Sequence, residues 1–549
     1  MTRLTPNDLS ALRDQLRAAE AKTFVSVGMS TCGIAAGATP VFKTLQELVA
    51  ARNLPGVVVR QVGCAGMCSR EPLVEVRVPG QPSVMYGNVN PELAEKIIES
   101  HLSGGVPVEE CRIPSLEEMA VFPGDPEPDS VNRPLQTRIV MRNCGLINPD
   151  SMEEYIARDG YQALAKVVSG MSQDDVVSEL EKSGLRGRGG AGFPTFMKWK
   201  FTKASKGDTH YIICNGDEGD PGAYMDRGIL EADPHSVLEG LIIGGYVIGA
   251  EKGIFYIRAE YPLAVERIEK AIKQARAAGL LGKNILGTEF SFDCEVRLGA
   301  GAFVCGEETA LIASVEGRRG TPRSRPPYPS QKGLWDKPTM INNVETLANV
   351  AQIILRGGDW FAKVGEGKSK GTKVFAVTGK VKYAGLMEIP MGTKLRDIVM
   401  KDGGGTSTGK PLKAIQTGGP AGGLIPESLL DTPVTYENLQ QLGSMMGSGG
   451  MIVMDETDDA VELARFYLGF CVDESCGKCA PCRLGGRQML TLLNKIADGK
   501  GTKADLEEVK KLARAMRTAS LCGLGQAAPN PVMSALRYFE DEFTKRLVG

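Results

Sequence analysis

The sequence predicts a multidomain α/β protein whose last segment is a small helical bundle. The prediction rests on a length of 549 residues, a glycine count of 67, and helical periodicity throughout residues 458–549. At about 150 residues per domain, this length indicates three or four domains. Glycine well above its usual share, without low complexity, indicates loops that approach a ligand closely.

The N-terminal segment, residues 1–112, is expected to form a small α/β unit. The apolar pattern predicts, in chain order, a helix over 7–21, a strand over 23–27, a helix over 39–52, a strand over 56–62, a hairpin over 73–86 turning at Pro79-Gly80, and a helix over 91–102. Residues 113–142 follow, and their polar, proline-rich composition predicts a linker.

Three further segments complete the chain. Residues 143–365 form a glycine-rich α/β region, and residues 366–456 are rich in Val, Thr and Gly with hairpin-like spacing, which predicts a small mixed β domain. Residues 457–549 are predicted to be helical, with helices over 460–468, 487–497, 503–518 and 531–547.

Composition narrows the function classes. With 64 basic and 66 acidic residues the net charge is −2, and aromatic residues make up 6%. A nucleic-acid partner is therefore not expected, because such proteins use a basic face or aromatic stacking platforms. The longest apolar run, 241–250, is shorter than the roughly 20 residues of a membrane span, and the start lacks a signal-peptide core. We expect a cytoplasmic protein, or a subunit held at the inner membrane through partners, without membrane insertion of its own.

The cysteines carry the strongest chemical signal. There are 13 of them against three histidines, so a bound metal would be held by sulfur. Cys476, Cys479 and Cys482 form a CxxCxxC run, and Cys522 follows farther along. Such a loop wraps three corners of a [4Fe–4S] cube while the remote cysteine supplies the fourth. The alternatives are a zinc knuckle, which usually takes paired CxxC units, or buried thiols.

A glycine-rich stretch, residues 184–194, is the second signal. Residues 187–192 match GxGxxG, but a dinucleotide fingerprint should follow a strand, and the preceding stretch, 174–182, has helical spacing. We therefore predict a loop whose amides and two arginines face a phosphate or a flavin edge. A flexible loop with no ligand is the alternative.

Four more polar motifs lie in the same α/β region, at 214–222, 299–309, 325–329 and 342–346. The first follows the apolar strand 211–213, and α/β folds place ligands at the carboxyl ends of strands. Each motif alone is compatible with a solvated loop. Together they predict a ligand site.

The motifs GRGGAGFP, CGEETAL, NNVETL and ESCGKCAPCR resemble those of the FMN- and NADH-binding flavoprotein subunit of respiratory complex I. They resemble even more closely the β (diaphorase) subunits of soluble NAD-linked hydrogenases and formate dehydrogenases. The resemblance covers nearly the whole chain. The stretch Gly219-Asp220-Pro221-Gly222 is similar to the hydrogenase-type branch.

This resemblance implies a fold and a set of cofactor contacts. The domains would be thioredoxin-like, Rossmann-like for FMN, β-grasp-like, and helical with the [4Fe–4S] cluster. FMN would be held by Gly187, Arg188, Gly189, Gly190, Lys198, Asn215, Asp217, Gly306, Asn342, Asn343 and Thr346. NADH would contact Phe193, Phe201, Asp220, Glu307, Glu308 and Tyr328. No catalytic side chain is implied, because the flavin carries the chemistry.

The function implied is that of an NADH:acceptor oxidoreductase subunit, which passes electrons between NAD(H), FMN and iron–sulfur clusters within a larger complex. The implied partners are a small thioredoxin-like [2Fe–2S] subunit and a larger iron–sulfur or catalytic subunit. The alternatives are a peripheral NADH dehydrogenase subunit of a complex I-like assembly and a docking scaffold. The terminal acceptor and electron bifurcation stay open.

Cys32, Cys64 and Cys68 resemble part of the thioredoxin-like [2Fe–2S] site of this family, which uses four cysteines. The position five before Cys32 is Val27, so one ligand is missing. Three hypotheses compete: a cluster completed by Ser26, a cluster completed by Cys111, or a domain that has lost its cluster and only docks partners.

Overall fold

A five-stranded sheet forms the N-terminal part of the molecule, in the order β2-β1-β3-β4-β5. The computed structural model describes residues 3–18, 22–125 and 135–548. Strands β1 and β2 are parallel, and β3 and β4 form the predicted hairpin, with Gly80 at positive φ in its turn. The elements of this part are α1 (Pro6–Ala18), β1 (Thr23–Gly28), α2 (Thr31–Ala36), α3 (Ala38–Ala51), β2 (Val57–Val62), β3 (Val74–Arg77), β4 (Val84–Tyr86), α4 (Pro91–Lys96) with a π turn (Ile97–Ser103), and β5 (Arg112–Ile113).

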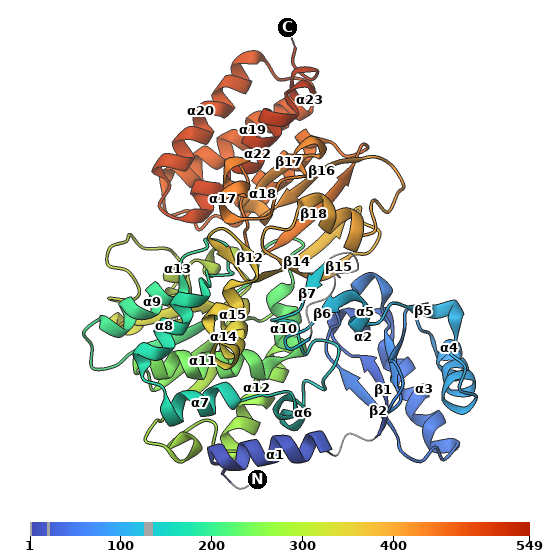
Figure 1. The fold of residues 1–549 in the computed structure, drawn as a ribbon. Coiled ribbons are helices and arrows are strands. Elements are labelled where there is room, and N and C mark those ends of the chain that lie inside the picture. The colour runs from blue at the N-terminus through green and yellow to red at the C-terminus, as the bar shows by residue number, and fades with distance from the viewer. Residues whose placement is uncertain (1–2, 19–21, 126–134, 549) are drawn as a thin grey trace.

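Helix α1 does not pack on this sheet. Leu9 is buried in the core of the following α/β region, with Leu12 and Leu16 against that core, and α1 contacts α6 and α7. Figure 1 shows α1 beneath these helices, apart from the strands that follow it. The apolar face of α1 thus finds its partner in the next part of the chain. The end of the predicted helix, residues 19–21, lies outside the described residues.

The predicted linker 113–142 is largely structured where it is described. It holds α5 (Leu116–Met119), β6 (Ala120–Val121) and β7 (Gln136–Thr137). The amides of Ile139, Val140 and Met141 are buried and donate to the carboxylate of Glu388 at 2.8–3.0 Å. Buried amides need such an acceptor, and only residues 126–134 of the stretch lie outside the description.

A four-stranded parallel sheet, in the order β10-β9-β8-β11, forms the centre of the molecule. Its residues face two cores by alternation: Ile212 and Cys214 meet the helical layer, whereas Ile213 packs with α13 on the other face. The elements are α6 (Met152–Ala157), α7 (Gln162–Gly170), α8 (Gln173–Ser183), α9 (Thr195–Ala204), β8 (Tyr211–Gly216), α10 (Met225–Ala232), α11 (Pro234–Ile248), β9 (Lys252–Arg258), α12 (Pro262–Ala277), β10 (Asp293–Gly299), α13 (Glu308–Val315), β11 (Thr339–Asn343), α14 (Val344–Arg356) and α15 (Gly358–Ala362).

The next part is a mixed sheet in the order β15-β14-β18-β16-β17. One face shares a core with α17, and the other, through Ala414 and Met454, shares a core with the C-terminal helices. Its elements are the short pair β12 (Gly365–Glu366) and β13 (Ser369–Lys370), then β14 (Thr372–Gly379), β15 (Gly385–Pro390), α16 (Leu395–Asp397), β16 (Leu412–Thr417), β17 (Gly423–Pro426), α17 (Tyr436–Gln441) and β18 (Gly450–Asp455).

The chain ends in the predicted helical bundle, at the top of Figure 1. The helix predicted over 531–547 is divided at Phe539, which has a non-helical conformation (φ −135°, ψ 36°). The helices are α18 (Ala460–Asp473), α19 (Gly486–Ala497), α20 (Lys503–Ala519), α21 (Gly523–Ala527), α22 (Asn530–Tyr538) and α23 (Glu540–Thr544). Within the described ranges, no helix has both the length and the apolar character needed to cross a bilayer.

Candidate functional site

The order of the central sheet marks where a ligand should bind. The chain moves outward from β8 to β9 and β10, then returns to place β11 on the other side of β8. Strand order therefore reverses between β8 and β11, and open parallel sheets bind ligands outside the carboxyl ends of strands at such a point. Asn215 lies near the end of β8 and Asn343 ends β11, and these two residues are register partners.

A cavity of about 890 Å³ lies at this point, within the range of roughly 300–1,000 Å³ typical of ligand pockets. Its wall comprises the glycine-rich loop, α9, the carboxyl ends of β8 and β11, the start of α14, and the segments 306–308 and 325–331. Of the predicted cofactor contacts, it is lined by Gly187, Gly189, Gly190, Phe193, Lys198, Phe201, Asn215, Gly306, Glu307, Glu308, Tyr328, Asn342, Asn343 and Thr346.

The glycine-rich loop is held in place by hydrogen bonds between its backbone and side chains of other elements. The Arg188 amide donates to Thr346 Oγ1 at 2.8 Å, and the Tyr436 hydroxyl donates to the Gly187 carbonyl at 2.9 Å. Gly190 has φ +122°, and a Cβ there would stand 3.2 Å from the backbone of Gly447. The loop thus requires glycine at this position, and the absence of a side chain leaves the cavity side open for close approach.

The Arg188 side chain does not reach the cavity. It is 1% exposed, and its guanidinium donates to the carbonyls of Thr372, Arg186 and Lys370 at 2.9, 2.9 and 2.6 Å. It therefore connects the loop to the mixed sheet. The expectation that both loop arginines face a phosphate or a flavin edge is not supported by these contacts, since Arg186 pairs with Glu437 at 2.5 Å.

Glu308 lies between two cations on the cavity wall. Lys198 Nζ is 3.3 Å and Arg325 Nη1 2.8 Å from its carboxylate oxygens. Burial opposes ionisation of Glu308, but Lys198 and Arg325 outweigh it and lower the pKa of this carboxyl. Arg325 was not among the predicted contacts, although it stands in the same motif as Tyr328; that proximity was the signal available.

The two asparagines of β11 use their amides differently. Asn343 donates to Asp226 Oδ2 at 2.6 Å and accepts from the Thr346 amide, so it caps α14. Asn342 accepts from Trp199 Nε1 at 2.8 Å. Trp199 and Asp226, which sequence reasoning missed, therefore position these side chains. Their apolar helical surroundings gave no functional signal.

Three acidic residues predicted at the site have other environments. Asp217 is buried 3.7 Å from Arg258 Nη1, and Asp220 accepts from Ser448 Oγ at 2.7 Å; neither lines the cavity. Burial raises their pKa values, to about 7 for Asp217 and about 6 for Asp220. Glu307 lines the cavity, but its carboxylate accepts from the first amides of α13 and caps that helix.

Cys476, Cys479, Cys482 and Cys522 all line one small hollow between the helical bundle and the central region. Ser475 Oγ lies 3.2 Å from Cys482 Sγ, and Val304 and Pro322 supply the opposite wall. Zinc would hold its sulfurs about 4 Å apart around one ion. Among the described residues, no three metal-ligating side chains converge in that way. The four-thiolate donor set fits a [4Fe–4S]-type group, in which each iron takes one cysteine.

Cys32, Cys64 and Cys68 also lie together, with the Cys68 thiol interacting with the other two. The two hypothetical fourth ligands lie elsewhere. Ser26 Oγ accepts from Arg60 Nε at 3.1 Å, and Cys111 Sγ donates to the Val108 carbonyl at 3.7 Å within the core of the N-terminal sheet.

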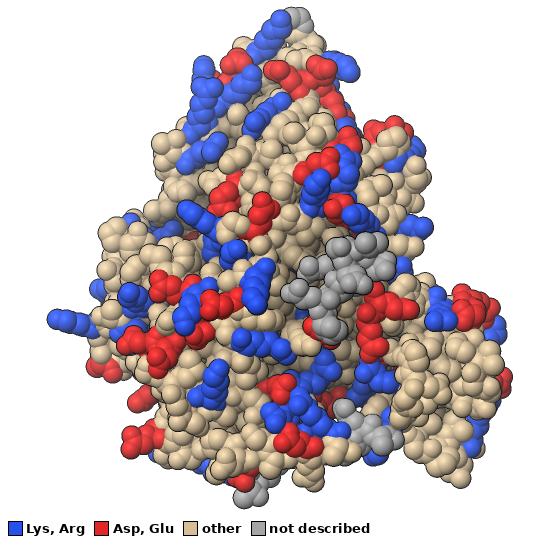
Figure 2. Space-filling view, viewed as in Figure 1, with Lys and Arg blue, Asp and Glu red and all other residues tan. Residues whose placement is uncertain are grey.

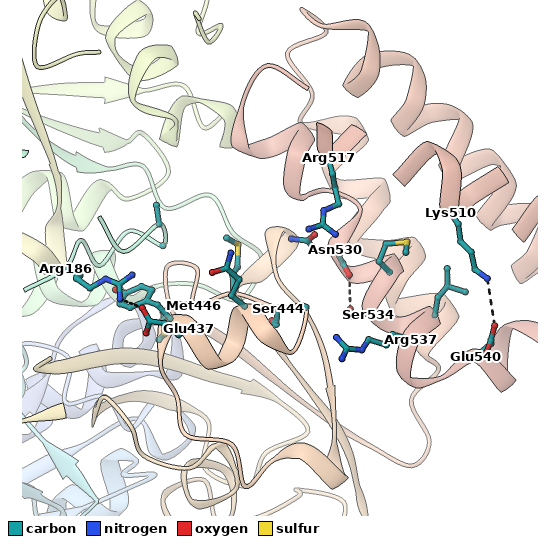
Figure 3. Close-up of a pocket in the computed structure, with 18 residues that line it drawn as sticks. Arg186, Glu437, Ser444, Met446, Lys510, Arg517, Asn530, Ser534, Arg537 and Glu540 are labelled. Atoms are coloured by element: carbon teal, nitrogen blue, oxygen red, sulfur yellow. Dashed lines mark hydrogen bonds and ion pairs between the residues drawn. The ribbon is translucent and has the colours of Figure 1, made fainter. Parts of the chain in front are cut away.

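A second cavity, of about 640 Å³, shares Gly190 and Ala191 of the glycine-rich loop with the first. Figure 3 shows Arg517 beside Asn530, and Arg537 near Ser534, across the cavity from Arg186 and Glu437. In the view of Figure 2, basic side chains gather over the C-terminal helices at the top, whereas acidic and basic side chains intermingle over the lower part of this face.

Comparison with known proteins agrees with this geometry. Residues 180–352 match the Nuo51 FMN-binding domain, and residues 462–546 match the NADH-ubiquinone oxidoreductase-F iron-sulfur binding region. The HndC subunit of the NADP-reducing hydrogenase of Solidesulfovibrio fructosivorans is 54% identical over 74% of this chain and 83% of its own. The F subunit of the NADH-quinone oxidoreductase of Aquifex aeolicus is 46% identical over 72% of this chain and 91% of its own.

Two solved structures extend the match over the N-terminal part. NAD+-reducing [NiFe]-hydrogenase in the H2-reduced state matches with a TM-score of 0.67 and 29% identity, over 100% of this chain and 93% of that one. The air-oxidised state gives 0.66 and 30%, over 99% and 88%. The chain therefore belongs to the flavin- and iron–sulfur-binding family that comprises the F subunits of NADH-quinone oxidoreductases and their hydrogenase counterparts.

Proposed function

We propose that this chain is the NADH-oxidising (diaphorase) subunit of a larger redox complex, with FMN in the 890 Å³ cavity and a [4Fe–4S] cluster at the four-cysteine hollow. When bound, FMN exchanges two electrons with a nicotinamide and passes them singly to an iron–sulfur centre. The chain's own residues bind, orient and shield these groups.

One observation carries the proposal. Cys522 lines the four-cysteine hollow, and Gly523, the next residue, lines the cofactor cavity. The two sites are therefore separated by the thickness of one backbone segment. The loop that carries the cysteine run is held against the central region at the same boundary: Lys478 Nζ donates to the Pro322 carbonyl at 2.6 Å, and the Phe303 amide donates to Glu474 at 2.9 Å.

The cavity wall suits a dinucleotide lying over a flavin. Phe193, Phe201 and Tyr328 line the cavity and are 44%, 49% and 52% exposed, so aromatic surface is available for stacking. Lys198 and Arg325 supply positive charge for phosphates, and Glu308 balances it. The glycine-rich loop offers backbone amides, which bind phosphate oxygens in such concave loops.

The proposal also assigns a fold to three of the domains and names two partner subunits. We propose a thioredoxin-like N-terminal domain, a Rossmann-like FMN domain and a β-grasp-like domain, supported by the sheet orders above. Partners would be a small thioredoxin-like [2Fe–2S] subunit and a larger iron–sulfur or catalytic subunit. The named relatives, subunits of hydrogenases and quinone oxidoreductases, support an assembly of this kind.

The test is cofactor content and turnover of the purified chain. We expect one FMN released per chain on denaturation, and NADH-dependent reduction of an artificial dye by the intact protein. A docking scaffold would show neither. A protein that lacks flavin after anaerobic purification with added FMN, and does not oxidise NADH, would contradict the proposal.

A further inference from the structure

The thiols of Cys32, Cys64 and Cys68 form a prepared site at the seam between the N-terminal sheet and the central region. Cys32 lies in the first turn of α2, whereas Cys64 and Cys68 belong to the loop between β2 and β3. The Gly66 amide donates to Cys64 Sγ at 3.3 Å, and Arg227 Nη2 of α10 donates to Cys32 Sγ at 3.6 Å. Donors aimed at sulfur stabilise its anionic form, as a metal-bound thiolate requires.

The 63–68 loop, which carries Cys64 and Cys68, is tightly packed against neighbouring backbone. A Cβ at Gly63 would stand 2.3 Å from Cα of Ala232, and one at Gly385 would stand 1.9 Å from the Gly66 carbonyl oxygen. The Leu386 amide donates to that same Gly66 carbonyl at 2.8 Å. The positions of the thiols are therefore fixed by the central region and the mixed sheet as well as by their own domain.

A buried carboxylate lies beside Cys32. Glu71 is 7% exposed; its Oε2 accepts from the Leu73 amide at 3.0 Å, and its Oε1 has no hydrogen-bond partner among the described residues. Two glycines make room for it, since Cβ atoms at Gly28 and Gly33 would stand 3.2 and 3.0 Å from its oxygens. Gly33 directly follows Cys32, and the Glu71 carboxyl interacts electrostatically with the Cys32 thiol.

An unpartnered buried carboxylate oxygen is costly unless it is protonated or bound to a cation. Iron bound by Cys32, Cys64 and Cys68 would be such a cation, and these three thiols leave one ligand position of a [2Fe–2S] cluster unfilled. Ser26 and Cys111, the other two candidates for the fourth ligand, have hydrogen-bond partners elsewhere. Ser26 Oγ accepts from Arg60, and Cys111 Sγ donates to the Val108 carbonyl. Glu71, by contrast, has a buried carboxylate oxygen that no hydrogen bond within the described residues engages.

We propose that the Glu71 carboxylate is the fourth protein ligand of a [2Fe–2S] cluster held by Cys32, Cys64 and Cys68. A two-iron rhomb takes its protein ligands in two pairs, one pair on each iron. The inference goes beyond the proposed function, because the FMN cavity and the four-cysteine hollow do not include Glu71.

The experiment uses the full chain, reconstituted anaerobically with iron and sulfide. Iron is counted, and the dithionite-reduced protein is examined by electron paramagnetic resonance at temperatures where the [4Fe–4S] signal is broadened away. The variants are Glu71→Gln and Glu71→Cys. Glu75→Gln is the matched control, because Glu75 is also a buried carboxylate of this domain, 3% exposed. Its Oε1 lies 3.1 Å from Arg77 Nη2, and its Oε2, like Glu71 Oε1, has no hydrogen-bond partner among the described residues.

We expect the unmodified chain to hold about two irons beyond the [4Fe–4S] cluster and to show a [2Fe–2S] signal. Glu71→Gln should release these irons to a chelator at least about tenfold faster, since loss of even an outer partner weakens metal sites roughly 10- to 100-fold. Glu71→Cys should keep the irons and shift the g values, because thiolate replaces oxygen. Glu75→Gln should match the unmodified chain.

Three results would overturn the assignment. They are a reconstituted chain without the [2Fe–2S] signal, a Glu71→Gln protein whose iron release and g values are unchanged, and equal iron loss in Glu71→Gln and Glu75→Gln. Flavin content and dye reduction by NADH are measured on the same samples. They report on the proposed function separately, so failure of one conclusion is distinguishable from failure of the other.

Discussion

Glu308 reduces the positive charge of the cavity wall. Its carboxylate neutralises part of the positive field of Lys198 and Arg325. A 2′-phosphate adds negative charge to the nucleotide, so we predict a preference for NADH over NADPH while this carboxylate is in place. The HndC relative, by contrast, is named for NADP.

Glu308→Gln should narrow that preference. With the carboxylate gone, Lys198 and Arg325 are free to attract the extra phosphate. The pair is partly exposed, so the expected change in the ratio of kcat/KM values is about fivefold, or roughly 1 kcal/mol. Steady-state rates with both nucleotides check it. Equal use of NADH and NADPH by the unmodified protein would refute the preference.

Cys479 is the central residue of the cysteine run, and its replacement should separate the two redox sites. Cys479→Ser should lose the [4Fe–4S] cluster, because serine oxygen is a poorer ligand for iron–sulfide than thiolate. FMN should stay bound and still be reduced by NADH, while electron delivery to partner proteins stops. Iron content and flavin bleaching are the measurements. Cys471→Ser is the control, since Cys471 is buried but lies outside the hollow. Unchanged iron in Cys479→Ser would reject the assignment.

At the scale of elements, the glycine-rich loop offers a matched pair of substitutions. Gly190 has φ +122° with Gly447 close by, whereas Gly187 has ordinary φ and only a 3.6 Å contact for an added Cβ. Gly190→Ala should strain the loop by about 1–3 kcal/mol and weaken FMN binding by roughly fivefold or more. Gly187→Ala should change it much less. Flavin titration followed by fluorescence compares them, and equal affinities would show that this conformation is not needed for binding.

Most helices and strands could be predicted from the sequence, because the spacing of apolar residues and the positions of turn-forming Gly and Pro residues determine them locally. The hairpin turning at Pro79-Gly80 and the helix α8 are confirmed. What could not be predicted depends on distant contacts. The burial of Ile139–Met141 requires Glu388, and the inward turn of the Arg188 side chain requires carbonyls of the mixed sheet. Neither partner is near in sequence.

The same division holds within the candidate site. Motif positions such as Lys198, Asn215 and Tyr328 do line one cavity. Asp217 and Asp220 of the acidic motif after β8 do not line it. Acidic residues that follow a strand look alike in sequence whether they face a cavity or, as with Asp220 and Ser448, a neighbouring loop. Cofactor roles of individual residues stay predictions.

For the molecule as a whole, buried carboxyls with raised pKa values predict that the free energy of unfolding decreases as the pH rises. Burial raises the pKa of Asp217 to about 7, and Arg258 only partly opposes this effect. The folded state therefore binds a proton that the unfolded chain, with its usual pKa near 3.8, has released. This contribution to stability is complete below about pH 4 and is lost as the pH rises to about 7.

Asp217→Asn should remove that loss. The apparent Tm of the flavin-free variant should exceed that of the unmodified chain at about pH 8 and match it near pH 4, where the carboxyl is neutral in the folded state. Thermal melts at several pH values check this. A constant Tm difference across the range would show that Asp217 does not titrate in this window.

The attachment of the N-terminal sheet has a consequence for motion. The sheet is held to the rest of the chain at two separate places, by the 2.8 Å ion pair of Arg60 in β2 with Glu154 in α6 and by the 63–68 loop against Ala232 and Gly385. A body attached at one point can swing about a hinge, whereas one attached at two points cannot do so without breaking a contact. The thiol site of this domain therefore keeps a constant separation from the cofactor cavity, and an electron exchanged between them would travel a fixed path instead of waiting for a domain to close.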